Sequence, residues 1–278
     1  MARPKIPLAG VIGDPVAHSL SPRLHGHWLS RYGLRGHYVP LEVNHADLAE
    51  VLRTLPRMGF VGVNVTIPHK EHVLTLADSV TDRAALIGAA NTLTFTAAGG
   101  IQADNTDGMG FLGSIRQSLP GWTASAGPAL VLGSGGAAKA IVWALLSDGA
   151  PVVYVANRTR ARADALKDQF GARVSPVDWT MIPDLVGDAS LIVNTTSLGM
   201  DGQPPLTIDL SRLRPPTVVS DIVYAPLRTA LLEEAASRGC ETVDGLGMLL
   251  HQAVPGFERW FSYTPLVDDD LRAAVLGA

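Results

Sequence analysis

Two side chains in the first half of the chain have the types and positions that proton transfer requires. Lys70 follows an apolar run at residues 60–65, and Asp107 follows another at residues 101–103. Ligands of α/β proteins bind beyond the carboxyl ends of the strands, so we expect the amine and the carboxylate to share one site. A hydride transfer at an alcohol carbon needs a group that takes up the hydroxyl proton. Lys70 or Asp107 could do this, and a hydrogen bond between them would hold both in place.

Small polar side chains also follow the predicted strands of this region. Together, their hydroxyl and amide groups would suit a polyhydroxylated acid. Taken singly, each is as well explained as a helix cap, a turn former or an exposed group. These residues are Ser19, Ser21, Asn64, Thr66 and Asn91.

A glycine-rich segment lies between an apolar run at residues 129–132 and a helical pattern at 136–147. Gly133, Gly135 and Ala138 match the pattern G-x-G-x-x-G/A, which allows a tight turn, a close approach of a pyrophosphate and close helix–strand packing. The helix N-terminus would offer N–H groups to the phosphates. The segment predicts a dinucleotide site, with an ordinary glycine turn as the alternative. The whole loop is Gly133, Ser134, Gly135, Gly136, Ala137 and Ala138.

The residues after the next predicted strand, 152–156, indicate which dinucleotide binds. NAD sites usually carry Asp or Glu there, about 20 residues after the glycine loop. This chain has Asn157 at that place, 157 − 133 = 24 positions after Gly133, followed by Arg158, Arg160 and Arg162. A carboxylate would repel a 2′-phosphate, whereas guanidinium groups donate paired hydrogen bonds to it. The pattern therefore predicts NADP; a solvated helix start is the alternative reading of the arginines.

Composition limits the class of protein. The chain has 278 residues, a formal net charge of −4, 47% hydrophobic and 17% charged residues, which predicts two domains with substantial cores. The mildly acidic balance argues against a nucleic-acid-binding face. The eight histidines lack the spacing of converging metal ligands, so no metal site is expected.

The sequence also predicts a cytoplasmic protein. Its single cysteine, Cys240, cannot form an internal disulfide, and no apolar run approaches the length that spans a bilayer. Residues 1–12 faintly resemble a signal peptide, but Asp14 and Pro15 follow at once, so we interpret residues 8–12 as a buried strand.

Strand and helix patterns alternate along both halves of the chain, which predicts an α/β fold. In the first half we expect strands at 8–12, 37–43 and 60–65, a hairpin of 92–96 with 101–103, and helices starting at Ser21 (as N-cap), Asn44 (as N-cap) and Lys70. A linker is expected at 118–128. In the second half we expect strands at 129–132, 152–156, 190–194, 218–223 and 241–243, with helices at 136–147, 159–170, 227–237, 246–261 and from Asp268.

Many ordered motifs of this chain match one known family. They lie at residues 13–22, 64–70, 88–92, 104–108, 133–138, 157–159, 194–200, 221–224 and 244–248, together with Gln252. Over essentially its whole length, the chain resembles the shikimate dehydrogenases. The resemblance implies reversible reduction of 3-dehydroshikimate to shikimate with NADPH, in the pathway to chorismate and aromatic amino acids. One mild departure is Ser134, where many members have Ala.

The resemblance also implies domains and residue roles. Residues 1–108, completed by 245–278, would form an α/β substrate domain to which the C-terminal helices return, and 109–244 a Rossmann-type, doubly wound NADP-binding domain. Lys70 and Asp107 would be the catalytic pair. Substrate ligands would be Ser19, Ser21, Asn64, Thr66, Asn91, Tyr224 and Gln252. The NADP site would comprise the Gly133–Ala138 loop, Asn157, Arg158, Thr159, Arg162, Thr195, Ile222, Gly245 and Met248.

Other activities stay open at this point. A quinate/shikimate dehydrogenase that uses NAD would share the fold and the Lys–Asp pair. A non-catalytic regulatory paralogue would be expected to lack Lys70 or Asp107, and both are present. A dehydrogenase of another small acid or a folate is also compatible, because a fold does not fix a function. Family members occur as monomers and homodimers.

Overall fold

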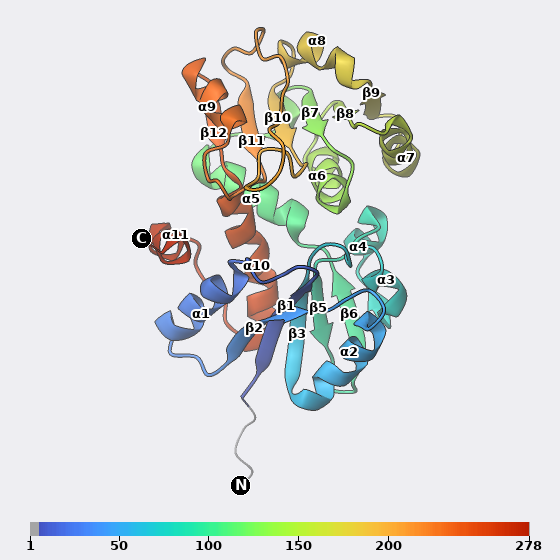
Figure 1. Ribbon diagram of the computed structural model, residues 1–278, viewed down its shortest axis with the longest axis vertical. Coiled ribbons are helices and arrows are strands. Elements are labelled where there is room, and N and C mark those ends of the chain that lie inside the picture. Colours follow the sequence, from blue (N-terminus) through green and yellow to red (C-terminus); the bar gives the residue numbers. More distant parts are fainter. Residues whose placement is uncertain (1–5, 278) are drawn as a thin grey trace. The chain divides into compact units, whose positions relative to one another are not determined.

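The computed structural model of the protein describes residues 6–277 (Figure 1). These residues form two compact units. The first contains the described residues up to Thr106 together with those from Leu250 onward, and the second is Asp107–Leu249. The predicted return of the C-terminal helices to the first part of the chain is therefore confirmed. The boundaries between the units, at 106/107 and 249/250, differ by a few residues from the expected boundaries at 108/109 and 244/245.

The first unit is built on a mixed sheet of six strands in the order β2-β1-β3-β5-β6-β4. Strand β1 pairs in parallel with β2 and β3, whereas β5 is antiparallel to both β3 and β6. The predicted hairpin is thus confirmed as β5 and β6. The strands are β1 (Leu8–Gly13), β2 (His37–Glu42), β3 (Phe60–Val65), β4 (Ser79–Val80), β5 (Thr92–Phe95) and β6 (Ile101–Asp104).

Helices cover both faces of this sheet, as Figure 1 shows. One face packs against α2 (Leu48–Thr54), the 3₁₀ turn η1 (Leu55–Met58), α3 (Val73–Leu76) and α4 (Asp82–Ile87), which share a core with the strands. The other face carries α1 (Ser21–Arg31) and the C-terminal part of α10 (Gly245–Phe261), and α11 (Asp269–Leu276) packs on α1.

Three predicted helix starts in this unit are wrong. Ser21 is the first residue of α1 rather than its cap; Leu20 occupies the cap position without a side-chain hydrogen bond. Asn44 closes a turn by accepting from the backbone N–H of Asp47, and α2 begins only at Leu48. Lys70 lies in a turn, and α3 begins only at Val73.

The second unit has the Rossmann strand order. Its six strands are all parallel and lie in the order β12-β11-β10-β7-β8-β9, so the strand order reverses between β7 and β10. The doubly wound fold predicted from the sequence is confirmed. The strands are β7 (Ala129–Leu132), β8 (Val153–Ala156), β9 (Val174–Val177), β10 (Leu191–Asn194), β11 (Val218–Asp221) and β12 (Glu241–Val243).

Two apolar cores lie on the two faces of this sheet. One includes α5 (Asp107–Ser118), α6 (Gly136–Ser147) and α7 (Arg160–Phe170), and the other includes α8 (Ile182–Val186) and α9 (Ala230–Ser237). Short 3₁₀ turns occur at η2 (Ala124–Ala126) and η3 (Trp179–Met181). The sequence analysis missed α5, whose glycines conceal the helical pattern. A Cβ at Gly108 would lie 2.6 Å from the carbonyl oxygen of Ala140, so glycine there permits close packing of α5 on α6.

Within residues 6–277, no helix is both long and apolar enough to cross a membrane. Residues 1–5, which belong to the segment with faint signal-peptide character, lie outside the described part of the chain.

Candidate active site

Three predicted substrate ligands meet in one buried hydrogen-bonded cluster of the first unit. The amide nitrogen of Asn91 donates to Oε1 of Gln252 at 2.9 Å and to Oγ1 of Thr106 at 3.0 Å. The amide nitrogen of Asn64 donates to the backbone oxygen of Asn91 at 3.1 Å. Because β5 is antiparallel to β3 and β6, the start of β5 lies beside the ends of both neighbours. This geometry explains how distant residues reach the same edge of the sheet.

The turn that carries Lys70 is hydrogen-bonded to the segment that carries Asn91. The backbone oxygen of Lys70 accepts from the N–H of Ala90 at 2.7 Å, and the N–H of Val65 donates to the oxygen of Asn91 at 2.8 Å. The buried ring of His69 contacts the backbone oxygen of Val43 through Nε2 at 2.7 Å. These contacts fix the backbone of Lys70 next to the amide cluster.

The remaining predicted ligands of this unit follow β1 and β3. Thr66 donates its backbone N–H to the oxygen of Ile12 at 2.9 Å, which ties the ends of the two strands together. Ser19 accepts the backbone N–H of Ser21 at 3.3 Å, so both serines lie at the start of α1. Since β1 and β3 are parallel neighbours, these side chains lie at the same sheet edge as Asn64.

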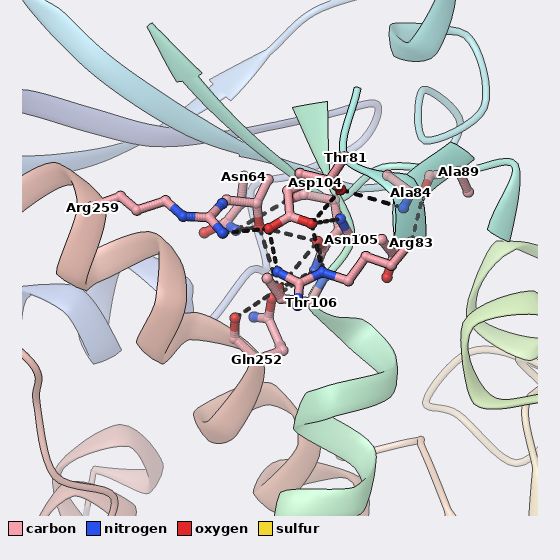
Figure 2. Close-up of polar contacts among 12 residues, drawn as sticks. Asn64, Thr81, Arg83, Ala84, Ala89, Asp104, Asn105, Thr106, Gln252 and Arg259 are labelled. Atoms are coloured by element: carbon pink, nitrogen blue, oxygen red, sulfur yellow. Dashed lines mark hydrogen bonds and ion pairs between the residues drawn. The ribbon is translucent and has the colours of Figure 1, made fainter. Parts of the chain in front are cut away.

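A buried carboxylate that the sequence analysis did not single out supports this edge. Figure 2 shows Asp104 between Arg83 of α4 and Arg259 of α10, which approach it from opposite sides. The Nε of Arg83 donates at 2.6 Å and Oγ1 of Thr81 at 2.8 Å. Burial alone would raise the pKa of Asp104, but the hydrogen bonds from Arg83, Thr81 and Arg259 outweigh it and hold the pKa well below its usual range. The same carboxylate accepts the backbone N–H of Asn105 at 2.8 Å, one residue before Thr106.

Asp107 directly follows Thr106 in the sequence and is the first residue of both α5 and the second unit. Lys70 belongs to the first unit. The hydrogen bond between the two side chains therefore stays a prediction.

In the second unit, the glycine loop lies at the point where the strand order reverses. Gly133 follows β7 with φ +110°, a conformation that favours glycine, and an added Cβ would lie 2.6 Å from Oγ1 of Thr195, which follows β10. At Gly135, by contrast, an added Cβ would meet no atom within 4 Å. Gly135 is also the N-cap of α6, where no side chain caps the helix.

This geometry is suited to a dinucleotide. Gly135, as N-cap, has no side chain to accept hydrogen bonds from the first N–H groups of α6, and the open space at Gly135 lets a phosphate approach them. Ala138 is fully buried, so its small side chain allows α6 to pack closely on the sheet. Of the other members of the predicted loop, Ser134 precedes the N-cap residue, and Gly136 and Ala137 are the first two residues of α6.

The three arginines after β8 are in two different environments. Arg160 donates to Asp164 at 3.0 Å and to Asp178 at 2.8 Å, hydrogen bonds that raise its pKa. Arg158 and Arg162 are exposed and form no ion pair with any residue in 6–277. Asn157 donates its amide N–H to the backbone oxygen of Thr159 at 2.9 Å, which shapes the turn. Arg158 and Arg162 are therefore the arginines available to an anion.

Asp221, at the end of β11, links the loop after β10, which contains Thr195, to the loop after β11, which contains Ile222. Its Oδ1 accepts from Asn194 at 2.9 Å and from the N–H of Val223 at 3.0 Å, and its Oδ2 accepts from Thr229 at 2.8 Å. Burial raises the pKa of Asp221, although these hydrogen bonds oppose the shift. The carboxyl thus ties the loop of Thr195 to the loop of Ile222 and Tyr224, a link that the sequence analysis missed.

Gly245 and Ile222 are brought together in the second unit. A Cβ at Gly245 would lie 2.2 Å from the backbone oxygen of Ile222, so only glycine fits without movement. Met248, one turn further along α10, packs into the core that includes α5 and α6. The same helix also carries Gln252, which belongs to the first unit and accepts the hydrogen bond from Asn91.

Comparison with known proteins places the chain in a family. Residues 11–93 match a model described as the shikimate dehydrogenase substrate binding domain, and residues 117–199 match one described as shikimate/quinate 5-dehydrogenase. The chain is 83% identical over 276 residues, which is 99% of each chain, to a shikimate dehydrogenase (NADP(+)) of Jannaschia sp. (strain CCS1). The chain belongs to the shikimate dehydrogenase family. The resemblance inferred from the sequence motifs is therefore confirmed.

Solved structures of two members of the wider fold family are similar over nearly the whole chain. Shikimate 5-dehydrogenase of Thermus thermophilus, in complex with NADP(H) and shikimate, has a TM-score of 0.86 at 35% identity and covers 97% of this chain and 98% of its own. Quinate dehydrogenase of Corynebacterium glutamicum, in complex with NAD, has a TM-score of 0.90 at 33% identity and covers 98% and 99%. Shikimate dehydrogenases thus share this fold with enzymes of a different specificity.

In the part of the chain that the structure describes, no group of three or more His, Cys, Asp or Glu side chains could hold a metal ion.

Proposed function

We propose that the chain is an NADP-dependent shikimate dehydrogenase that reversibly reduces 3-dehydroshikimate to shikimate, in the pathway to chorismate and aromatic amino acids. The observation that carries the proposal is the buried cluster of Asn91, Thr106 and Gln252 beside the turn of Lys70, in a chain 83% identical to a shikimate dehydrogenase (NADP(+)). Amide and hydroxyl groups at one sheet edge suit the ring hydroxyls of the substrate.

Lys70 gives the ketone oxygen its proton during reduction and takes it back during oxidation. Asp107 orients the amine and stabilises its charged form. Ser19, Ser21, Asn64, Thr66, Asn91, Tyr224 and Gln252 bind the substrate. The hydrogen-bonded backbone at Lys70 and Ala90 limits the positions that the amine can reach, which favours proton transfer at one oxygen.

The second unit binds NADP. When bound, NADPH supplies the hydride for the reduction. The N–H groups at the start of α6 bind the pyrophosphate beside Gly135, and Arg158 and Arg162 bind the 2′-phosphate. Gly245 and Met248 would contact the nicotinamide, and Thr195 and Ile222 would also bind the cofactor. Asn157 and Thr159, which are hydrogen-bonded to each other, would complete the cofactor site.

Quinate oxidation with NAD is the second candidate, because a quinate dehydrogenase in complex with NAD has the same fold at 33% identity. Asn157 argues against it, since the site has no carboxylate to accept a hydrogen bond from the ribose 2′-hydroxyl.

One assay tests both candidates. The absorbance of reduced nicotinamide is followed with shikimate or quinate, each with NADP or NAD. We expect kcat/KM to be highest for shikimate with NADP, by at least about tenfold over every other pair. Faster turnover of quinate with NAD would favour the second candidate, and no turnover of either acid would refute both.

We also propose that the protein is cytoplasmic and is a monomer or a homodimer. The single cysteine is consistent with the cytoplasm, and both a monomer and a homodimer are compatible with the fold.

A further inference from the structure

Tyr38, on the edge strand β2, points its hydroxyl at one of the substrate-site amides. The hydroxyl donates to Oδ1 of Asn64 at 2.7 Å, and this hydrogen bond is buried. The ring is only 7% exposed. None of the motifs that identify the family includes Tyr38, and no role follows for it from the amino-acid type alone.

The hydrogen bond determines which way the Asn64 amide faces. Its nitrogen donates to the backbone oxygen of Asn91 at 3.1 Å and to Oγ1 of Thr92 at 3.2 Å. An asparagine amide has nearly the same shape when its oxygen and nitrogen are exchanged. In the exchanged orientation the amide oxygen would face the carbonyl oxygen of Asn91, and the hydroxyl of Tyr38 would lose the oxygen that accepts its proton. The observed orientation is therefore the favourable one.

The tyrosine ring is held by a second buried ring. His25 stacks on Tyr38 with ring centroids 3.9 Å apart and an angle of 5° between the planes. His25 is fully buried, and burial lowers its pKa to about 3, so the imidazole is neutral at physiological pH. It also packs edge-on against Trp28. The phenol ring therefore has one position available.

Burial raises the pKa of the Tyr38 hydroxyl well above its usual value, so the group stays protonated and keeps the proton that it donates to Asn64.

We propose that Tyr38 is a positioning residue for substrate binding: its hydroxyl, carried by a ring that stacks on His25, fixes the orientation of the Asn64 amide within the proposed substrate site. The proposal rests on the proposed function. Tyr38 takes no part in proton or hydride transfer, so its loss acts on the binding of shikimate rather than on the chemical step or on NADP.

The test compares Tyr38→Phe with Tyr32→Phe in the full-length protein. Tyr32 is a matched control in the same unit: its hydroxyl accepts the N–H of Leu266 at 3.0 Å and its ring packs on Tyr263. For Tyr38→Phe we expect the KM for shikimate to rise about tenfold, with kcat within about twofold of the wild type and the KM for NADP unchanged. Tyr32→Phe leaves all three constants unchanged.

A double-mutant cycle tests whether Tyr38 acts through Asn64. In the Asn64→Ala background, Tyr38→Phe should have no further effect on the KM for shikimate, because the amide that it orients is absent. Additive effects would overturn the proposal.

The other outcomes are equally decisive. The proposal would be overturned if Tyr38→Phe left the KM for shikimate unchanged, or if it lowered kcat and NADP affinity equally. It would also be overturned if Tyr38→Phe did not fold, because the hydroxyl would then serve folding. A wild-type protein that does not oxidise shikimate would instead refute the proposed function.

Discussion

The side-chain amide of Asn91 donates a hydrogen bond to Oε1 of Gln252 at 2.9 Å, although the two residues are 161 positions apart. Thr106 strengthens the link, because its hydroxyl donates to the backbone oxygen of Gln252 at 2.8 Å. The proposed substrate site of the first unit is therefore complete only after the chain has passed through the second unit and returned.

Replacing Lys70 by methionine tests the proton-transfer role. Lys70→Met keeps most of the side-chain volume but removes the amine, so we expect kcat to fall by about 10²–10⁴-fold with a much smaller change in the KM for shikimate. Lys167→Met on α7 is the control, because this exposed lysine lies outside the proposed site. Steady-state kinetics measure both, and a Lys70→Met enzyme with near-normal kcat would exclude the assignment.

Replacing single arginines after β8 tests cofactor selection. Arg158→Ala should raise the KM for NADPH by about tenfold or more and leave the KM for NADH unchanged, because a charged hydrogen bond to the 2′-phosphate is worth about 1.5–3 kcal/mol. Arg160→Ala should have little effect, since the guanidinium of Arg160 is paired with Asp164 and Asp178. If Arg160→Ala weakened NADPH binding more than Arg158→Ala did, the assignment would be reversed.

Two glycine substitutions separate folding from cofactor binding. Gly133→Ala places a Cβ 2.6 Å from Oγ1 of Thr195 at φ +110°, so we expect a lower melting temperature. Gly135→Ala meets no atom within 4 Å, so we expect an unchanged melting temperature but weaker NADPH binding, because the methyl group occupies the space for the pyrophosphate. Differential scanning fluorimetry and NADPH titration measure both effects. Full NADPH affinity in Gly135→Ala would contradict the proposed position of the cofactor.

Local sequence patterns predicted the second unit well, since its strands are continuous apolar runs and its glycine loop has a defined context. Helix 136–147 and strands 129–132 and 241–243 match the structure residue for residue. Strand β9 was missed because Val174–Val177 contains Pro176, which an edge strand tolerates but which weakens the strand pattern.

Long-range contacts could not be predicted in the same way. Asp104 belongs to a recognised motif, but nothing in the sequence indicates that Arg83 and Arg259 bind it, the latter from 155 positions away. The stacking of His25 on Tyr38 could not be inferred from the sequence either, because it depends on how α1 packs on β2. The sequence thus identified residues that could perform the chemistry and missed those that hold them in place.

The buried carboxylate of Asp104 gives the first unit a specific response to acid. Its pKa is lowered in the folded protein, so the carboxylate stabilises the fold above its unfolded pKa of about 3.9, and this contribution is lost as the pH falls towards the folded value. Asp104→Asn should lower the free energy of unfolding at pH 7 by about 3–5 kcal/mol, because it leaves Arg83 and Arg259 without their charge partner. Urea denaturation at a series of pH values should show this difference narrowing below about pH 4. Asp164→Asn, which breaks the exposed pair with Arg160, should cost at most about 0.5 kcal/mol at any pH. A difference between wild type and Asp104→Asn that stays constant down to pH 3 would show that the ionised carboxylate is not the source of the stabilisation.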